Sequence, residues 1–121
     1  MNEQLYDGNA LRHRLMNDEA LVVLVAKEFL ADMPRQLTSL QAALVADDAA
    51  ASGRHAHSIK GAAANMGTMA LSCAAAQMER ACAEGRLAEA AAELPALQNL
   101  WRATRAAIET ALPVTVERKS A

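Results

Sequence analysis

The chain of 121 residues is 53% apolar but only 2% aromatic, so its core must consist mainly of alanine, leucine, valine and methionine, which favour packed helices. Its formal charge of −2 gives no basic excess for nucleic acid, and no apolar run of about eighteen residues could cross a membrane. The N-terminal MNEQLYDGN lacks the basic start and apolar stretch of a signal peptide, so we expect one cytoplasmic domain over residues 1–121.

Two helices are predicted in the first part of the chain. A short one, over about residues 8–15, is expected to cap one end of the fold. Asp18 has the side chain of an N-cap for a second, long helix. Its apolar residues recur at three- and four-residue steps: Leu21, Leu24, Val25, Phe29, Met33, Leu37, Leu40 and Leu44. Pro34 lies inside this stripe, where its missing NH predicts a kink rather than an end.

Three further helices follow. Asp47 or Asp48 can cap a helix over about residues 48–66, whose C-terminus Gly67 would end. The apolar side of this helix consists of Ala56, Ile59, Ala63 and Met66. A helix after Thr68 carries Leu71, Ala74, Ala75, Met78 and Cys82 in register, and Gly85 ends it. The last helix runs from near Leu87 through Ala91, Leu94, Leu97, Trp101, Thr104, Ile108 and Leu112.

These elements predict an all-α fold, an antiparallel up-and-down four-helix bundle with a short additional N-terminal helix. Its core should span about residues 8–112. We expect a kink or break at Pro95, an end at Pro113, and a frayed tail over 113–121. Cys73 and Cys82 are nine residues apart, on nearly opposite helix faces, so we expect both to stay reduced and Cys82 to be buried.

The stretch HSIKGAAANMG, residues 57–67, contains the candidate site. At roughly 100° per residue, His57 points well over 100° away from the centre of the apolar side, so its ring should be exposed. Gly61 and Ala64 share that outward face, and Lys60 flanks it. A glycine inside a helix costs about 0.5–1 kcal/mol relative to alanine, so Gly61 indicates a surface cleared for another molecule. Lys60 can stabilise negative charge on the ring.

The pattern H-x-x-K-G-x-x-x-x-x-G, made by His57, Lys60, Gly61 and Gly67, resembles the signature of histidine phosphotransfer (HPt) domains of two-component phosphorelays. The resemblance extends over about residues 10–112. It implies that His57 accepts a phosphoryl group from the aspartate of one receiver domain and passes it to the aspartate of another. The domain would be a carrier without kinase or ATP-binding activity, and without a cofactor of its own.

The resemblance also implies roles for single residues. Lys60 would lie near the phosphoryl oxygens, while Gly61 and Ala64 would leave room for the receiver. Glu79, twenty-two residues after the histidine, would hydrogen-bond the imidazole and set its orientation. Gly67 would form the turn that ends the helix, and Phe29 would pack beneath the histidine region. The partners would be receiver domains, which bring Mg²⁺, and a hybrid sensor kinase; we expect a monomer.

The same residues allow other interpretations. His55 and His57 form an H-x-H pair, but they diverge by about 200° on a helix and cannot bind one metal ion, so no metal site is predicted. The bundle could be a docking module for receivers or kinases that transfers no phosphate, although it retains the histidine that such modules lose. His57 could also be phosphorylated directly by a chemotaxis-type kinase acting in trans or belonging to a longer chain.

Overall fold

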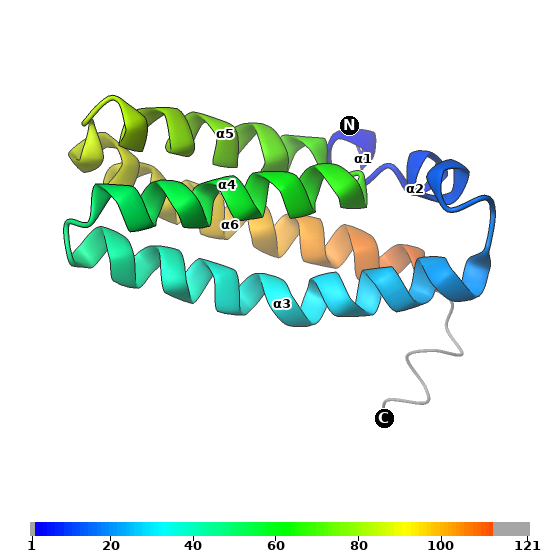
Figure 1. Ribbon diagram of the computed structural model, residues 1–121. Coiled ribbons are helices and arrows are strands. Elements are labelled where there is room, and N and C mark those ends of the chain that lie inside the picture. Colours follow the sequence, from blue (N-terminus) through cyan, green and yellow to red (C-terminus); the bar gives the residue numbers. More distant parts are fainter. Residues whose placement is uncertain (1, 113–121) are drawn as a thin grey trace.

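The computed structural model describes residues 2–112, which are almost entirely helical (Figure 1). Six helices follow one another within these described residues: α1 (Asn2–Leu5), α2 (Gly8–Arg14), α3 (Glu19–Val45), α4 (Ala49–Met66), α5 (Met69–Ala83) and α6 (Leu87–Ala111). No helix within this described part combines the length and hydropathy needed to cross a bilayer. Pro113 and the expected frayed tail lie outside the described residues.

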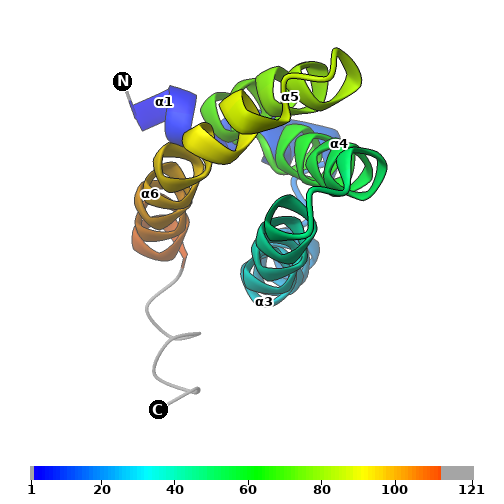
Figure 2. The ribbon, with the colours of Figure 1, turned by 90° about the vertical axis from the view of Figure 1, so that its left-hand side faces the viewer.

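Helices α3 to α6 form the predicted antiparallel bundle. Each of the four runs opposite to the one before it, and the end-on view shows them arranged around a common centre (Figures 1 and 2). Helix α3 packs against α4 and α6, and α5 packs against the same two helices, so the ring is closed. The prediction of an all-α four-helix bundle is confirmed.

The helix ends were predicted well because capping depends on neighbouring residues. The carboxylate of Asp18 accepts from the backbone NH of Leu21 at 3.1 Å, so Asp18 is the N-cap of α3. Of the two candidates for α4, Asp48 is the N-cap, and it accepts from Ala51 at 3.0 Å. Gly67 ends α4 in the left-handed conformation, with φ of 79°, as expected for a glycine in this place.

The apolar face of α4 is as predicted: Ala56, Ile59, Ala63 and Met66 are all buried. The start of the α3 stripe was wrong, because Leu21 and Leu24 are 37% and 57% exposed, whereas Val22 and Ala26 are buried. The buried row continues backward from Phe29 in steps of three and four through these smaller residues. In α6, likewise, Ala90 is buried and Ala91 is exposed.

Neither internal proline ends its helix. Helix α3 continues through Pro34 and α6 through Pro95, so the break considered at Pro95 does not occur. The carbonyl of Pro34 accepts a hydrogen bond from Thr38 Oγ1 at 3.0 Å. Whether either proline bends its helix stays a prediction.

The N-terminal segment contains two short helices where one was expected. The four-residue α1 packs against α5 and α6, and α2 packs against α3, so together they cover one end of the bundle. A backbone hydrogen bond from the NH of Asp7 to the carbonyl of Gly67, 2.8 Å long, ties this segment to the α4–α5 turn. Leu11 is buried at 1% exposure and completes the cap. A single helical turn is too short to be read from periodicity.

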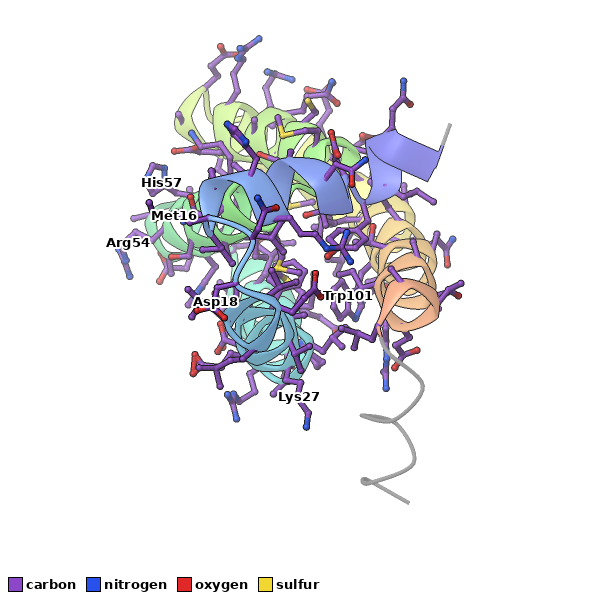
Figure 3. The ribbon with its side chains drawn as sticks, turned by 90° about the vertical axis from the view of Figure 1, so that its right-hand side faces the viewer. Met16, Asp18, Lys27, Arg54, His57 and Trp101 are labelled. Atoms are coloured by element: carbon purple, nitrogen blue, oxygen red, sulfur yellow. The ribbon has the colours of Figure 1, made fainter. Side chains whose placement is uncertain are left out.

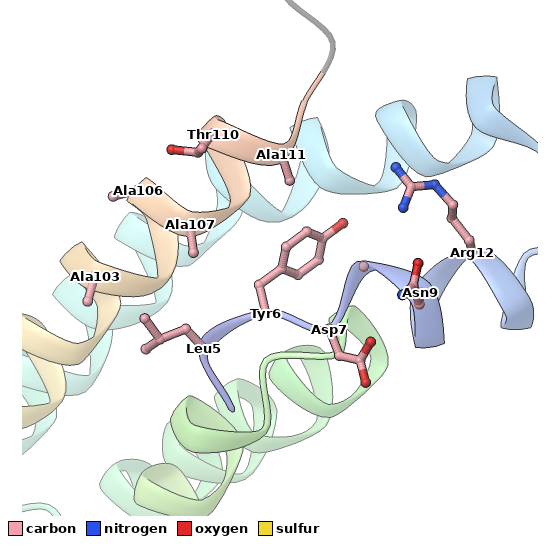
Figure 4. A pocket seen from close by; sticks show the side chains of 11 residues that line it. Leu5, Tyr6, Asp7, Asn9, Arg12, Ala103, Ala106, Ala107, Thr110 and Ala111 are labelled. Carbon is pink, nitrogen blue, oxygen red and sulfur yellow. The ribbon is translucent and has the colours of Figure 1, made fainter. Parts of the chain in front are cut away.

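A groove of about 560 Å³ lies between this segment and α6 (Figure 4). The ring of Tyr6 lies between the two walls, and its partial burial raises the pKa of the phenol above the usual range. The α6 wall is formed by small residues: Ala103, Ala106, Ala107, Thr110 and Ala111. None of the residues that line this groove comes from α4.

Both cysteines are free, as expected. Cys73 is exposed on α5 and Cys82 is buried, so they lie on different sides of the helix. Burial raises the pKa of the Cys82 thiol, which favours its protonated, unreactive form.

Candidate functional site

His57 stands on the outer surface near the middle of α4. Its side chain is 65% exposed, whereas Ala56 and Ile59 on either side of it are fully buried. In the view along the bundle, His57 and Arg54 project outward from α4, and Trp101 lies inside between the helices (Figure 3). The exposed imidazole expected from the helical pattern is therefore present.

The surface beyond the ring, one turn toward the helix C-terminus, is open. A Cβ added to Gly61 would have no other atom within 4 Å, apart from its own helix turn and chain neighbours. Ala64, another turn on, is partly buried and presents only a methyl group. Neither position adds bulk beside the ring, so a second molecule has room to approach.

Glu79 of α5 joins the site by a pair of contacts. Its Oε2 lies 2.9 Å from His57 Nδ1, and its Oε1 lies 2.8 Å from Lys60 Nζ. The hydrogen bond from Lys60 lowers the pKa of Glu79 below its usual value; partial burial opposes this shift, and the bond with His57 adds to it. The carboxylate is therefore charged at neutral pH and bridges the two side chains of α4.

This bridge determines which ring nitrogen is free. An ionised carboxylate can only accept hydrogen bonds, so Nδ1 must be the nitrogen that carries the proton. In the neutral ring the lone pair then belongs to Nε2, for which no hydrogen-bond partner exists among the described residues. The ring presents an unengaged nucleophilic nitrogen to solvent.

Lys60 forms an ion pair that the sequence did not predict. Its side chain is 35% exposed and its ammonium group is bonded to Glu79 rather than extended over the ring. The positive charge that was expected beside His57 is therefore offset by the carboxylate between them. Lys60 is nevertheless only one helical turn from His57, within reach of a group bound on the ring.

A groove of about 570 Å³ runs beside His57 along the α4–α5 seam. Its lining includes Arg54, His57 and Glu79, together with small residues: Ala49, Ala50, Gly53, Ser58, Cys82 and Ala83. Sequence reasoning did not assign Arg54 to the site, although its position three residues before His57 places it on the same side of the helix.

The remaining predicted residues are structural. A Cβ on Gly67 would lie 2.8 Å from the carbonyl oxygen of Asp7, so glycine is required there by contact as well as by φ. The ring of Phe29 meets Trp101 edge-on, with centroids 5.6 Å apart, and it borders a surface hollow with Ala62. Packing in the core therefore accounts for Phe29.

His55, the second member of the H-x-H pair, is partly buried. Within residues 2–112, no three His, Cys, Asp or Glu side chains are grouped so that they could hold a metal ion.

Comparison with known families gave one result. A family model described as Hpt domain matches residues 25–107, which is well over half of the chain and includes all of α4 and α5. Neither the curated proteins nor the solved structures gave a match.

Proposed function

The chain belongs to the Hpt domain family, and on this premise we propose that His57 is its phosphoacceptor. Members of the family are phosphocarrier modules of two-component systems rather than kinases, and receiver domains are their partners. The observation that carries the proposal is the pair formed by His57 and Glu79, which commits Nδ1 and leaves an exposed Nε2.

The chemical step follows from that arrangement. The Nε2 lone pair attacks the phosphorus of a receiver's aspartyl phosphate, the P–O bond to the aspartate breaks, and the carboxylate leaves with the bonding electrons. The ring gains positive charge while Nδ1 keeps its proton, and the Glu79 carboxylate, 2.9 Å away, stabilises that charge. The reverse sequence delivers the phosphoryl group to the aspartate of a second receiver.

Lys60 supplies charge to the transferred group. Its ammonium is bonded to Glu79 in the resting protein, so contact with the phosphoryl oxygens requires it to leave or share that bond. A phosphoryl group carries more negative charge than a carboxylate and lies one helical turn away, which favours the exchange. Lys60 would thus neutralise the equatorial oxygens once the group is near Nε2.

The partner supplies the rest of the reaction centre. Transfer requires the receiver's aspartate, Nε2 and the phosphorus to be in line, so the receiver must come within a few ångströms of α4. The open surface at Gly61 and the small side chain of Ala64 support such an approach. We expect Mg²⁺ and the acidic groups that hold it to belong to the receiver.

The test is phosphoryl transfer to the whole chain. The protein is incubated with a panel of ³²P-phosphorylated receiver domains, and the same panel is applied to His57→Gln. The proposal expects acid-labile label on the native chain with at least one receiver, and none on His57→Gln at unchanged helicity. Label that persists on folded His57→Gln would contradict it, and binding of receivers without any transfer would favour the docking module instead.

A further inference from the structure

The α4–α5 seam carries a hydrogen bond with no direct part in the phosphoryl transfer. Ser72 on α5 is 6% exposed, and its Oγ donates to the backbone carbonyl of Lys60 at 3.0 Å. The residues are 12 apart in sequence, so the bond joins two helices. We propose that Ser72 is a positioning residue. It would fix the axial position of α4 relative to α5, so that Glu79 contacts both His57 and Lys60. This inference rests on the proposed function.

The spacing on α5 places Ser72 and Glu79 in one row facing α4. They are seven residues apart, which is about two helical turns, so their directions differ by only about 20°. Side chains lean toward the N-terminus of their helix, and the Glu79 carboxylate therefore leans toward the level of Ser72. Apart from the contacts of Glu79, two hydroxyl groups bond α5 to α4 within residues 2–112. Thr68, the N-cap of α5, donates to the carbonyl of Ala63 at 2.8 Å, and Ser72, one turn further along, donates to Lys60 beside the site.

The bond matters because Glu79 tolerates little displacement. Its two oxygens hold partners at 2.9 and 2.8 Å, and N–H···O hydrogen bonds in proteins are confined to about 2.7–3.2 Å and weaken steeply when they bend. Small residues such as Ala50, Gly53 and Ala83 line the groove along this seam, and small residues interlock little against sliding along the helix axis. A directional bond to the Lys60 carbonyl restricts that sliding.

A matched control is available elsewhere in the bundle. Thr104 Oγ1 donates to the carbonyl of Leu100 at 2.8 Å, one turn earlier in the same helix, and Thr104 is fully buried. Thr104→Ala therefore removes a buried hydroxyl and its hydrogen bond without touching the α4–α5 seam. It measures what a general loss of stability does to the site.

The experiment is a double-mutant cycle between Ser72→Ala and Glu79→Gln in the full chain. The probe is phosphoramidate, a small donor whose P–N bond breaks as the Nε2–P bond forms and ammonia leaves. Its use separates the chemistry of the site from the docking of receivers. The rate of His57 phosphorylation and the NMR signal of the Nδ1 proton are recorded for each variant and for Thr104→Ala.

The proposal expects Ser72→Ala to slow phosphorylation about fivefold, the ratio that corresponds to loss of one neutral hydrogen bond. In the Glu79→Gln background the same change should have little effect, since Ser72 acts through Glu79. The Nδ1 proton signal should broaden in Ser72→Ala and stay sharp in Thr104→Ala. Equal slowing in both backgrounds, or equal slowing by Thr104→Ala, would overturn the proposal.

A second variant keeps the test decisive if Ser72→Ala unfolds. Ser72→Cys preserves nearly the same volume but offers only a weak donor, so it should fold and react more slowly than the native chain. A native rate in folded Ser72→Cys would also overturn the proposal. Failure of the native chain to accept phosphate from phosphoramidate and from every receiver would instead count against the proposed function.

Discussion

Substitution of Gly61 should separate the stability of the fold from the access of a receiver domain to His57. A glycine in a helix interior costs about 0.5–1 kcal/mol relative to alanine. At Gly61 no described atom outside the local helix turn lies within 4 Å of the added Cβ to oppose the gain. Gly61→Ala should therefore raise the melting temperature by about 2–5 °C. Glutamine has nearly the same helix propensity, so Gly61→Gln should show a similar gain.

Phosphoryl transfer from receivers should decrease in Gly61→Gln although the melting temperature rises. In Gly61→Gln the longer side chain occupies the surface where a receiver must approach, so transfer from a phosphorylated receiver should fall at least tenfold, which corresponds to about 1.4 kcal/mol. Transfer from phosphoramidate should be nearly unchanged, because a small donor does not need that surface. Melting is followed by circular dichroism and transfer by the ³²P label.

Gly67→Ala provides the control for these measurements. Its φ of 79° and the carbonyl oxygen of Asp7, 2.8 Å from the added Cβ, predict destabilisation instead of a gain. A Gly61→Gln protein that takes phosphate from receivers at the native rate would refute the explanation of this glycine by access. A lowered melting temperature in Gly61→Ala would refute the claim that there is room for a Cβ at this position.

Three further predictions follow from the contacts of single side chains. Folding lowers the pKa of Glu79, so its stabilisation should be complete above its ordinary value of 4.5 and lost as the pH falls below it. The stability gap between the native chain and Glu79→Gln, about 1 kcal/mol or less by urea unfolding at neutral pH, should thus shrink in acid. Lys60→Ala should shorten the lifetime of the phosphorylated protein, measured by loss of label, while leaving the melting temperature within a few degrees. Ser52→Ala should raise the free energy of unfolding by about 1 kcal/mol or more, because Ser52 Oγ is buried without a hydrogen-bond partner among residues 2–112; a loss of stability there would point to a bound water.

The parts of the fold that the sequence predicted depend on neighbouring residues. Asp18 and Asp48 cap their helices through side-chain bonds that span three residues, and Gly67 is needed for one left-handed turn. Leu21 and Leu24 were misplaced because residues 20–26 are all apolar, so periodicity could not show which row of the first turns faces the core. The buried row is the one through Val22 and Ala26.

In the candidate site, too, the features set by a single helix were predicted, and those set by the packing of two helices were not. The outward direction of His57 and the open surface at Gly61 follow from rotation around one helix, and the pattern shared with HPt domains pointed to Glu79. The bond from Lys60 to Glu79 and the bond from Ser72 to the Lys60 backbone were missed. Both depend on how far α5 is shifted along α4, a distance that neither helical periodicity nor motif spacing contains.

The most direct test of the central claim is to identify the atom that carries the phosphate. The protein is labelled with ¹⁵N in its histidine rings, phosphorylated by a receiver domain, and studied by ³¹P–¹⁵N correlation NMR. We expect a single coupling, to Nε2 of His57, with Nδ1 still protonated toward Glu79. Phosphate on Nδ1 of that ring, or on His13 or His55, would contradict it.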